Sequence, residues 1–203
     1  MESPTLAVRH DFDTLSTASR IEVRPAKHVE IPDIALMART MVPGVHISEK
    51  ALLQHYLHDG ECILMFVQEG RLLGGMAFLY LSERGLDALI SGELTPMHPD
   101  FGLLAKRDEQ VAAIYIWAIG STGRGIAGLG KMSEFLRRPR YVNANCLAQP
   151  STAAGRELMI ATGFRPIASS QPDLWCYERP WKRLPAGLAA SNFNQGSISD
   201  ARY

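Results

Sequence analysis

The sequence predicts a mixed α/β domain, built on one central sheet that helices cover. Short apolar runs of strand length alternate with segments in which apolar residues recur at helical spacing. A glycine-rich turn, Thr122–Ala127, joins the fourth of the predicted strands to the helical segment that follows it. From the N-terminus onward, the segments predict the order β-α-α-β-β-loop-β-α-β-α-β-β, which amounts to seven strands and four helices.

The first half of the chain supplies three predicted strands and two predicted helices. Alternating apolar and polar residues predict the first strand, and two apolar runs around Gly70 predict an antiparallel hairpin. The two helical segments each carry apolar residues along one face, and Ser48 is a typical N-cap for the second. These elements are a strand at 21–25, helices at 30–41 and 48–57, and strands at 62–67 and 72–81.

Residues 82–107 carry a weak pattern interrupted by glycines and prolines, so we expect a long connection with one helical turn. Loops of this length in compact domains are often functional. The elements after it are a buried strand at 111–119, a helix at 126–138, a strand at 140–148, a helix at 153–162, and two closing strands at 164–167 and 174–177.

The chain ends lack such periodicity. We expect a flexible N-terminal extension at 1–19, one folded domain at 20–182, and a flexible tail at 183–203 that is rich in Ser, Gly, Asn and Ala. The first twenty residues lack the apolar core of a signal peptide, and no run reaches the roughly 18–20 apolar residues that span a bilayer. We therefore expect a cytoplasmic location.

Charge and cysteine content exclude several kinds of partner. Lys plus Arg and Asp plus Glu number 21 each, so the formal net charge is zero and does not favour nucleic acid or an anionic membrane. The three cysteines are widely spaced and form no CxxC pair, so we expect neither a metal site nor a disulfide framework.

The glycine-rich turn is the strongest candidate for a ligand site. Gly123 and Gly125 let the backbone approach an anion closely, and a helix that begins near Ile126 adds unpaired N–H groups and its positive end. Backbone of this kind binds phosphate without a charged side chain. The sequence therefore predicts a phosphate-binding turn after the fourth strand.

This order of elements, with a glycine-rich turn after the fourth strand, resembles the GNAT superfamily of acyl-coenzyme A-dependent N-acyltransferases. In that family the turn follows the pattern Gln/Arg-x-x-Gly-x-Gly/Ala and wraps the pyrophosphate of acetyl-CoA. Gly125 and Ala127 match the two small positions, whereas Thr122 departs from the expected Gln or Arg. Gly163-Phe164 resembles the Gly-Phe pair that ends the last helix of the family. The resemblance covers residues 21–181 and implies a GNAT-like mixed sheet of about six or seven strands flanked by about four helices.

The resemblance also implies a cofactor site. Acetyl-CoA, or another acyl-CoA, is the expected co-substrate, with no metal. In the family the fourth and fifth strands splay apart around the pantetheine arm, and a backbone N–H late in the fourth strand polarises the thioester carbonyl, here near Trp117 or Ile119. The candidate cofactor-binding residues are Trp117, Ile119, Thr122, Gly123, Arg124, Gly125, Ile126, Ala127 and Asn145.

Acyl transfer to an amine usually needs a base for the amine and a proton for the departing thiolate. The tyrosine that the family often places four residues before the Gly of Gly-Phe is Met159 here. The candidates for catalysis are Glu109 as base, Tyr115 as acid, and Cys146 as a nucleophile that carries the acyl group. A solvated carboxylate, a packed aromatic ring and a buried core cysteine are the respective structural alternatives.

Two functional hypotheses follow. The first is direct transfer of an acetyl or other acyl group from acetyl-CoA to a primary amine of a small molecule or protein. The alternative is a catalytically weak or inactive GNAT-like domain that binds acyl-CoA or a protein partner, as Thr122 and Met159 suggest. The same fold with a different donor, for example a longer acyl chain on a carrier protein, is a further option. The acceptor and the oligomeric state stay open, a homodimer being one option.

Overall fold

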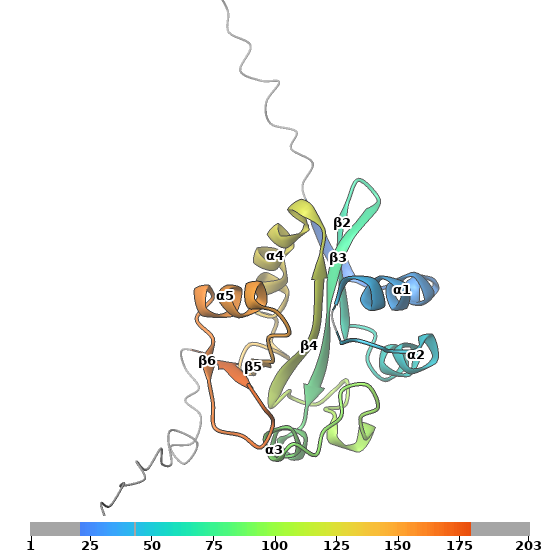
Figure 1. The fold of residues 1–203 in the computed structure, drawn as a ribbon. Helices are drawn as coiled ribbons and strands as arrows, with labels where there is room; N and C mark the ends of the chain where they lie inside the picture. Colours follow the sequence, from blue (N-terminus) through green and yellow to red (C-terminus); the bar gives the residue numbers. More distant parts are fainter. Residues whose placement is uncertain (1–20, 43, 180–203) are drawn as a thin grey trace, which may run out of the picture.

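The computed structural model describes residues 21–42 and 44–179, and the predicted N-terminal extension and C-terminal tail lie outside them (Figure 1). These residues form one seven-stranded sheet in the order β1-β2-β3-β4-β5-β7-β6. Neighbouring strands run antiparallel, except that β4 and β5 run parallel. The structure therefore confirms a mixed α/β fold with a sheet of six to seven strands.

The strands follow the predicted order. The hairpin of β2 and β3 is confirmed, and it turns through Glu69 and Gly70, whose φ angles of 50° and 75° suit the tight turns that join twisted strands. The strands are β1 (Glu22–Pro25), β2 (Ile63–Gln68), β3 (Arg71–Leu81), β4 (Ala113–Ser121), β5 (Asn145–Ala148), β6 (Arg165–Pro166) and β7 (Trp175–Tyr177).

Helices cover both faces of the sheet. Figure 1 shows α1 and α2 on one side of β3 and β4, and α4 and α5 on the other. Side chains cap α2 and α5, since Ser48 Oγ accepts from Ala51 N (3.1 Å) and Thr152 Oγ1 accepts from Gly155 N (3.0 Å). The helices are α1 (Ile31–Met41), α2 (Glu49–His58), α3 (Glu83–Ser91), α4 (Gly128–Phe135) and α5 (Ala153–Ala161), with 3₁₀ turns η2 (His28–Glu30), η3 (Phe101–Leu103) and η4 (Gly123–Ala127).

The expected loop at 82–107 is wrong in part, because it contains the two-turn helix α3. Ser82 caps this helix by accepting from Gly85 N, and Gly92 ends it in the left-handed conformation at φ 81°. Gly85 was one reason for predicting a loop in this segment. A Cβ on Gly85 would lie 2.0 Å from the carbonyl oxygen of Leu103, so this glycine allows close packing against η3 rather than a turn.

The fifth strand and the helix before it are shorter than predicted. The strand begins at Asn145 instead of 140, and residues 139–143 form turns. The buried Tyr141 causes this, because its hydroxyl donates to Glu61 Oε2 (2.6 Å) and its ring stacks on Tyr80. The predicted helix at 126–138 divides into η4 and α4, since a Cβ on Gly128 would lie 2.7 Å from the ring of Phe66 and the helix starts hard against β2.

Candidate functional site

The parallel strands β4 and β5 part halfway along β4. Their pairing runs from Ala113 opposite Asn145 to Ile116 opposite Ala148, where β5 ends. β4 continues through Trp117–Ser121 with β3 on one side, and within residues 21–42 and 44–179 no strand pairs with this part of β4 on the side where β5 lay. The backbone groups on that side are left for a ligand to bind, as an extra strand would.

A β-bulge lies at the point where the strands part. Ala118 faces Ala77 of β3 and Ile116 faces Phe78, so Trp117 has no opposite residue in the register. Bulges re-aim side chains and interrupt the ladder, and they are over-represented beside active sites. Trp117 is thus outside the paired registers of both neighbouring strands.

The glycine-rich turn η4 follows β4 directly and is held against β3. Thr122 donates both its N–H (2.8 Å) and its hydroxyl (3.1 Å) to the carbonyl oxygen of Leu73. Gly125 is buried, and a Cβ there would lie 2.5 Å from Ser121 Oγ and 3.1 Å from Leu73. Thr122 and Gly125 therefore fix the turn in place.

The remaining residues of the turn are turned outward. Gly123, Arg124, Ile126 and Ala127 are exposed, and Gly123 takes a φ of 51° that favours glycine. The first N–H groups of a helical segment have no partner inside it, and none of the described residues accepts from the N–H of Gly123 or Arg124. The end of β4 therefore offers exposed donors beside the positive end of a helix.

Tyr115 brings its hydroxyl to the divergence. It is buried, and its hydroxyl donates to Oε1 of Gln149 (2.6 Å), the first residue after β5. Burial raises the pKa of Tyr115 to about 12, so the phenol keeps its proton at neutral pH.

Cys146 lies within the paired part of β5, opposite Ile114 and Tyr177. Its side chain is 5% exposed, and burial raises its pKa to about 11. A thiol with that pKa holds very little thiolate at neutral pH, which favours the core alternative over a nucleophile.

Asn145 also lies at the paired end, opposite Ala113. Its side-chain oxygen accepts from the backbone N–H of Arg179 (3.0 Å), whose buried guanidinium donates to the carbonyls of Ala144 and Leu136. Three residues of β5, roughly 10 Å of strand, separate Asn145 from the point of divergence. Asn145 holds the segment after β7 and lies away from the open part of β4.

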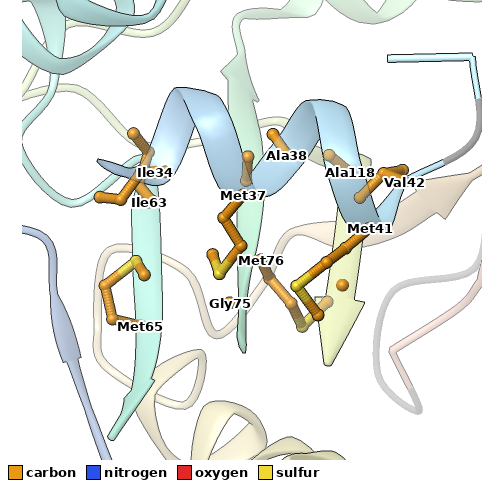
Figure 2. Close-up of a pocket in the computed structure, with 12 residues that line it drawn as sticks. Ile34, Met37, Ala38, Met41, Val42, Ile63, Met65, Gly75, Met76 and Ala118 are labelled. Carbon is orange, nitrogen blue, oxygen red and sulfur yellow. The ribbon is translucent and has the colours of Figure 1, made fainter. Parts of the chain in front are cut away.

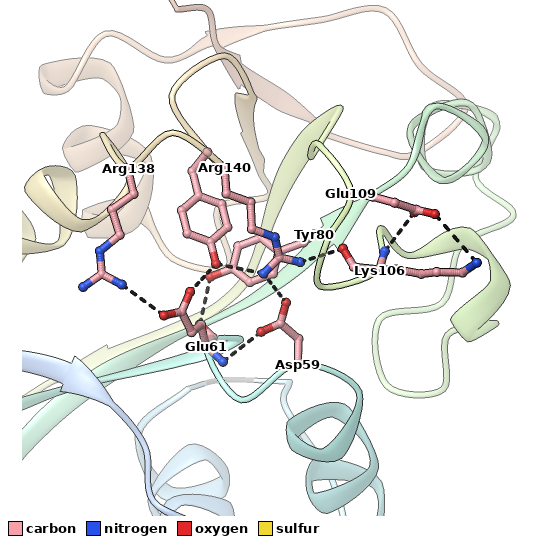
Figure 3. A network of polar contacts seen from close by, with 8 residues as sticks. Asp59, Glu61, Tyr80, Lys106, Glu109, Arg138 and Arg140 are labelled. Carbon is pink, nitrogen blue, oxygen red and sulfur yellow. Dashed lines mark hydrogen bonds and ion pairs between the residues drawn. The ribbon is translucent and has the colours of Figure 1, made fainter.

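Glu109 belongs to a polar network at the other end of β4 (Figure 3). Its carboxylate accepts from Lys106 N (3.0 Å) and pairs with Lys106 Nζ (3.8 Å). In the same network Arg140 donates to Asp59 (2.6 Å) and to the carbonyl of Lys106 (3.1 Å). Four residues of β4, roughly 13 Å, lie between the start of the strand and Trp117, so Glu109 is not brought to the divergence.

Met159 does lie at the divergence. It projects from α5 and packs with Ala148 and Trp175, the residues at the end of β5 and on β7, and against Ile116. A thioether has no proton to donate. The position where the family often carries a tyrosine therefore borders the last pair of β4 and β5, but offers packing only.

The buried face of α2 contributes residues that sequence reasoning missed. The His55 ring lies with its centroid 5.7 Å from that of Trp117 and 5.9 Å from that of Phe101, and His58 lies 5.2 Å from Phe101. His55 is 3% exposed, and burial lowers its pKa to about 4. The spacing of His55 from Ala51 and Leu52 could have identified it, because this spacing places all three residues on the buried face of α2.

A methionine-rich pocket lies between α1 and the sheet (Figure 2). Ala118 and Gly120 of β4 form part of its wall, directly after the bulge. Methionine side chains adapt to the shape of what they contact. The pocket is lined by Ile34, Met37, Ala38, Met41, Val42, Ile63, Met65, Gly75, Met76, Ala77, Ala118 and Gly120.

Two properties of the described part of the chain bear on its partners. None of its helices is long and apolar enough to cross a membrane. Residues 21–42 and 44–179 contain no group of three or more His, Cys, Asp or Glu side chains placed to hold a metal ion.

No protein-family model matches the chain, and no curated protein matches its sequence. Solved structures match its fold. The loading GNATL domain of CurA from Lyngbya majuscula gives a TM-score of 0.56 at 10% identity, over 78% of this chain and 98% of that one. The GphF GNAT-like decarboxylase, solved with isobutyryl-CoA, gives 0.54 at 14% identity, over 77% and 98%. Diaminobutyrate acetyltransferase EctA from Paenibacillus lautus, solved with L-2,4-diaminobutyric acid and coenzyme A, gives 0.53 at 11% identity, over 82% and 99%.

At 10–14% identity these matches establish a shared fold and nothing finer. The chain has the GNAT fold, as the order of its elements and its two short motifs predicted. The described residues form five α-helices, one more than expected, and α3 is the extra one.

Proposed function

We propose that this GNAT-fold chain is an N-acyltransferase, which moves an acetyl or other acyl group from acyl-CoA directly to a primary amine. The observation that carries the proposal is the parting of β4 and β5 at the bulged Trp117, in line with the exposed turn η4. The GphF and EctA structures, described with isobutyryl-CoA and with coenzyme A, support an acyl-CoA donor on this fold.

The donor would lie along the open side of β4. Its pantetheine amides would bond the backbone groups of Trp117–Ser121 on the side away from β3, and its pyrophosphate would meet the turn Thr122–Ala127. The thioester would then sit beside Trp117, where the N–H of Trp117 or Ile119 donates to the carbonyl oxygen. Such a donor accelerates the reaction because it faces charge that develops only in the transition state.

Tyr115 would assist the departure of the sulfur. Its neutral phenol lies at the divergence, and a phenol with a pKa of about 12 donates a hydrogen bond readily but gives up its proton poorly. Ordinary thiols have a pKa near 8.5, so the thiolate can leave without receiving a proton at once. A full general acid at position 159 is therefore dispensable, and Tyr115 would stabilise the sulfur by turning its hydroxyl from Gln149 toward it.

A second candidate function is an acyl-CoA-binding domain without transfer activity. Met159 favours it, because the side chain that borders the end of β5 supplies no proton. One structural neighbour is described as a decarboxylase, so the fold alone does not decide the reaction.

Calorimetric titration with acetyl-CoA, followed by a coenzyme A release assay over a broad amine panel, tests both candidates. Binding together with amine-dependent release supports the transferase. Binding without release supports the second candidate. Absence of heat at millimolar acetyl-CoA overturns both.

A further inference from the structure

We propose that His55 is the base of the transfer and that, with Trp117, Phe101 and His58, it forms one wall of an acceptor site for weakly basic aromatic amines. This inference rests on the proposed function and names the acceptor class of that same site. The four rings are here called the aromatic box.

His55 lies close to the place proposed for the thioester. His55 projects from α2 onto β4 and contacts Trp117, the bulged residue beside which the thioester would lie. Phe101, from η3, also contacts the His55 ring, edge-on at an interplanar angle of 75°. An amine nitrogen that donates to His55 beside Trp117 would be close to a carbonyl carbon bound at the bulge.

Several ring nitrogens of the aromatic box make no hydrogen bond with the described residues. Both ring nitrogens of His55, Nε2 of His58 and Nε1 of Trp117 are buried, and none has a hydrogen-bond partner in the part of the chain that the structure describes. Buried polar atoms are normally paired, so a group of such atoms on touching rings needs an explanation. A bound amine supplies one, because its nitrogen donates to an imidazole and its ring packs on the aromatic faces.

The charged and titratable groups around His55 disfavour its protonation. His58 on the same helix and His98 on the segment before η3 both oppose its protonation. The Met97 carbonyl favours protonation but makes no hydrogen bond of normal geometry. The buried Asp59 at the end of α2 is committed to Arg140 and to the backbone N–H of Glu61. His55 is therefore neutral at pH 7 and can accept a proton.

The same charges favour an uncharged amine over an alkylammonium ion as the acceptor. An alkylammonium ion entering the box would meet imidazoles and no uncommitted carboxylate among the groups that act on His55. An aromatic amine is uncharged at neutral pH, and its ring matches the walls of the box. It also arrives with the lone pair that attacks the thioester, so its ammonium form need not be deprotonated first.

The step balances without a further reactant. The amine lone pair attacks the thioester carbon and forms the C–N bond, and Nδ1 or Nε2 of His55 takes the proton that the nitrogen loses. The C–S bond breaks and the sulfur leaves as a thiolate. The His55 imidazolium then gives its proton to that thiolate, which yields an amide and free coenzyme A and returns the base to its neutral form.

The test uses the full chain with acetyl-CoA and either 4-methoxyaniline or n-hexylamine. We expect coenzyme A release with the arylamine and little with the alkylamine. We expect His55→Gln to lower kcat by about 10²–10⁴-fold while acetyl-CoA affinity stays the same. The matched control is His46→Gln, the same change at an exposed histidine, which should retain wild-type rates.

A second measurement does not depend on how the variant folds. In the unmodified protein, 4-methoxyaniline should shift the histidine side-chain NMR signals of the box, and His55→Asn assigns them as a second variant. The inference is overturned if His55→Gln keeps more than half the wild-type kcat, if n-hexylamine is acetylated as fast as the arylamine, or if the arylamine leaves those signals unmoved. Failure to bind acetyl-CoA at all would instead overturn the proposed function.

Discussion

The Tyr115 hydroxyl and the Gln149 side chain join β4 to the residue that follows β5, across the point where the two strands part. Gln149 passes the contact on, because its Nε2 donates to the carbonyl of Pro172 (2.6 Å) on the approach to β7. One hydrogen-bonded chain therefore sets the positions of the three segments that border the divergence.

Tyr115→Phe removes the first bond of this chain and leaves the ring packing intact. We expect a loss of about 1 kcal/mol in the free energy of unfolding, the usual net worth of one hydrogen bond, measured by urea titration. If the hydroxyl stabilises the departing sulfur, kcat should also fall about tenfold while the KM for acetyl-CoA is unchanged. Tyr56→Phe, at a tyrosine of α2 that contacts His28, is the control for both measurements, and an unaltered kcat would remove Tyr115 from the chemistry.

Cys146→Ala should retain amine acetylation. The thiol is buried and its pKa is raised to about 11, so direct transfer does not use it. The expected cost is instead structural, about 1–2 kcal/mol from loss of a buried sulfur next to Arg179 and Tyr177. Steady-state rates with an accepted amine check this, and a variant that folds but releases no coenzyme A would restore the acyl-cysteine route.

The sequence predicted the sheet and the turn because both depend on local pattern. The hairpin strands are apolar runs around Gly70, and Gly123 and Gly125 predict the exposed turn. The sequence could not predict what long-range contacts decide. Gly85 lies within α3 and packs against Leu103 instead of ending the helix. The local sequence pattern does not reveal this contact.

The candidate site shows the same division. Trp117 was expected near the thioester from the resemblance, whereas its bulge depends on the register with β3. His55 resembles any histidine on an apolar helix face until α2 is docked on a strand 62 residues further along. The distance of Glu109 from the divergence likewise follows from strand direction, which residue types alone do not reveal.

The ion pair of Glu30 and Arg24 should make stability sensitive to acid. The carboxylate accepts from both terminal nitrogens of Arg24 (2.9 and 2.6 Å) and from Lys27 N (2.7 Å). These bonds, with that of Arg24 the largest cause, lower the pKa of Glu30 from 4.5 to about 2. A lowered acid pKa stabilises the fold above the unfolded value, and this contribution is lost as pH falls through the folded value.

Glu30→Gln tests that prediction by thermal unfolding at several pH values. At pH 6 the variant should be less stable by about 1 kcal/mol, allowing for solvent screening at a partly exposed site. The difference should shrink between pH 4.5 and pH 2. A difference that stays constant across this range would show that the carboxylate charge does not stabilise the fold.

Gly125→Ala should weaken both the fold and acetyl-CoA binding. A Cβ there would meet Ser121 Oγ at 2.5 Å and Leu73 at 3.1 Å through both its Cβ and its carbonyl oxygen. The serine can rotate, but the Leu73 carbonyl cannot yield because it accepts both bonds from Thr122. The turn must therefore lift from β3, at a cost of about 1–3 kcal/mol.

Gly130→Ala is the matched control, since it adds the same methyl group two residues into α4 where nothing lies within 4 Å. It should raise the free energy of unfolding by about 0.5–1 kcal/mol, as alanine favours helix, and leave acetyl-CoA affinity unchanged. Urea unfolding and calorimetric titration measure the two quantities on each variant. If the turn holds the pyrophosphate, Gly125→Ala should lose at least about tenfold in acetyl-CoA affinity, because the exposed N–H groups of Gly123 and Arg124 move with it. Wild-type affinity in a destabilised Gly125→Ala protein would instead place the pyrophosphate elsewhere.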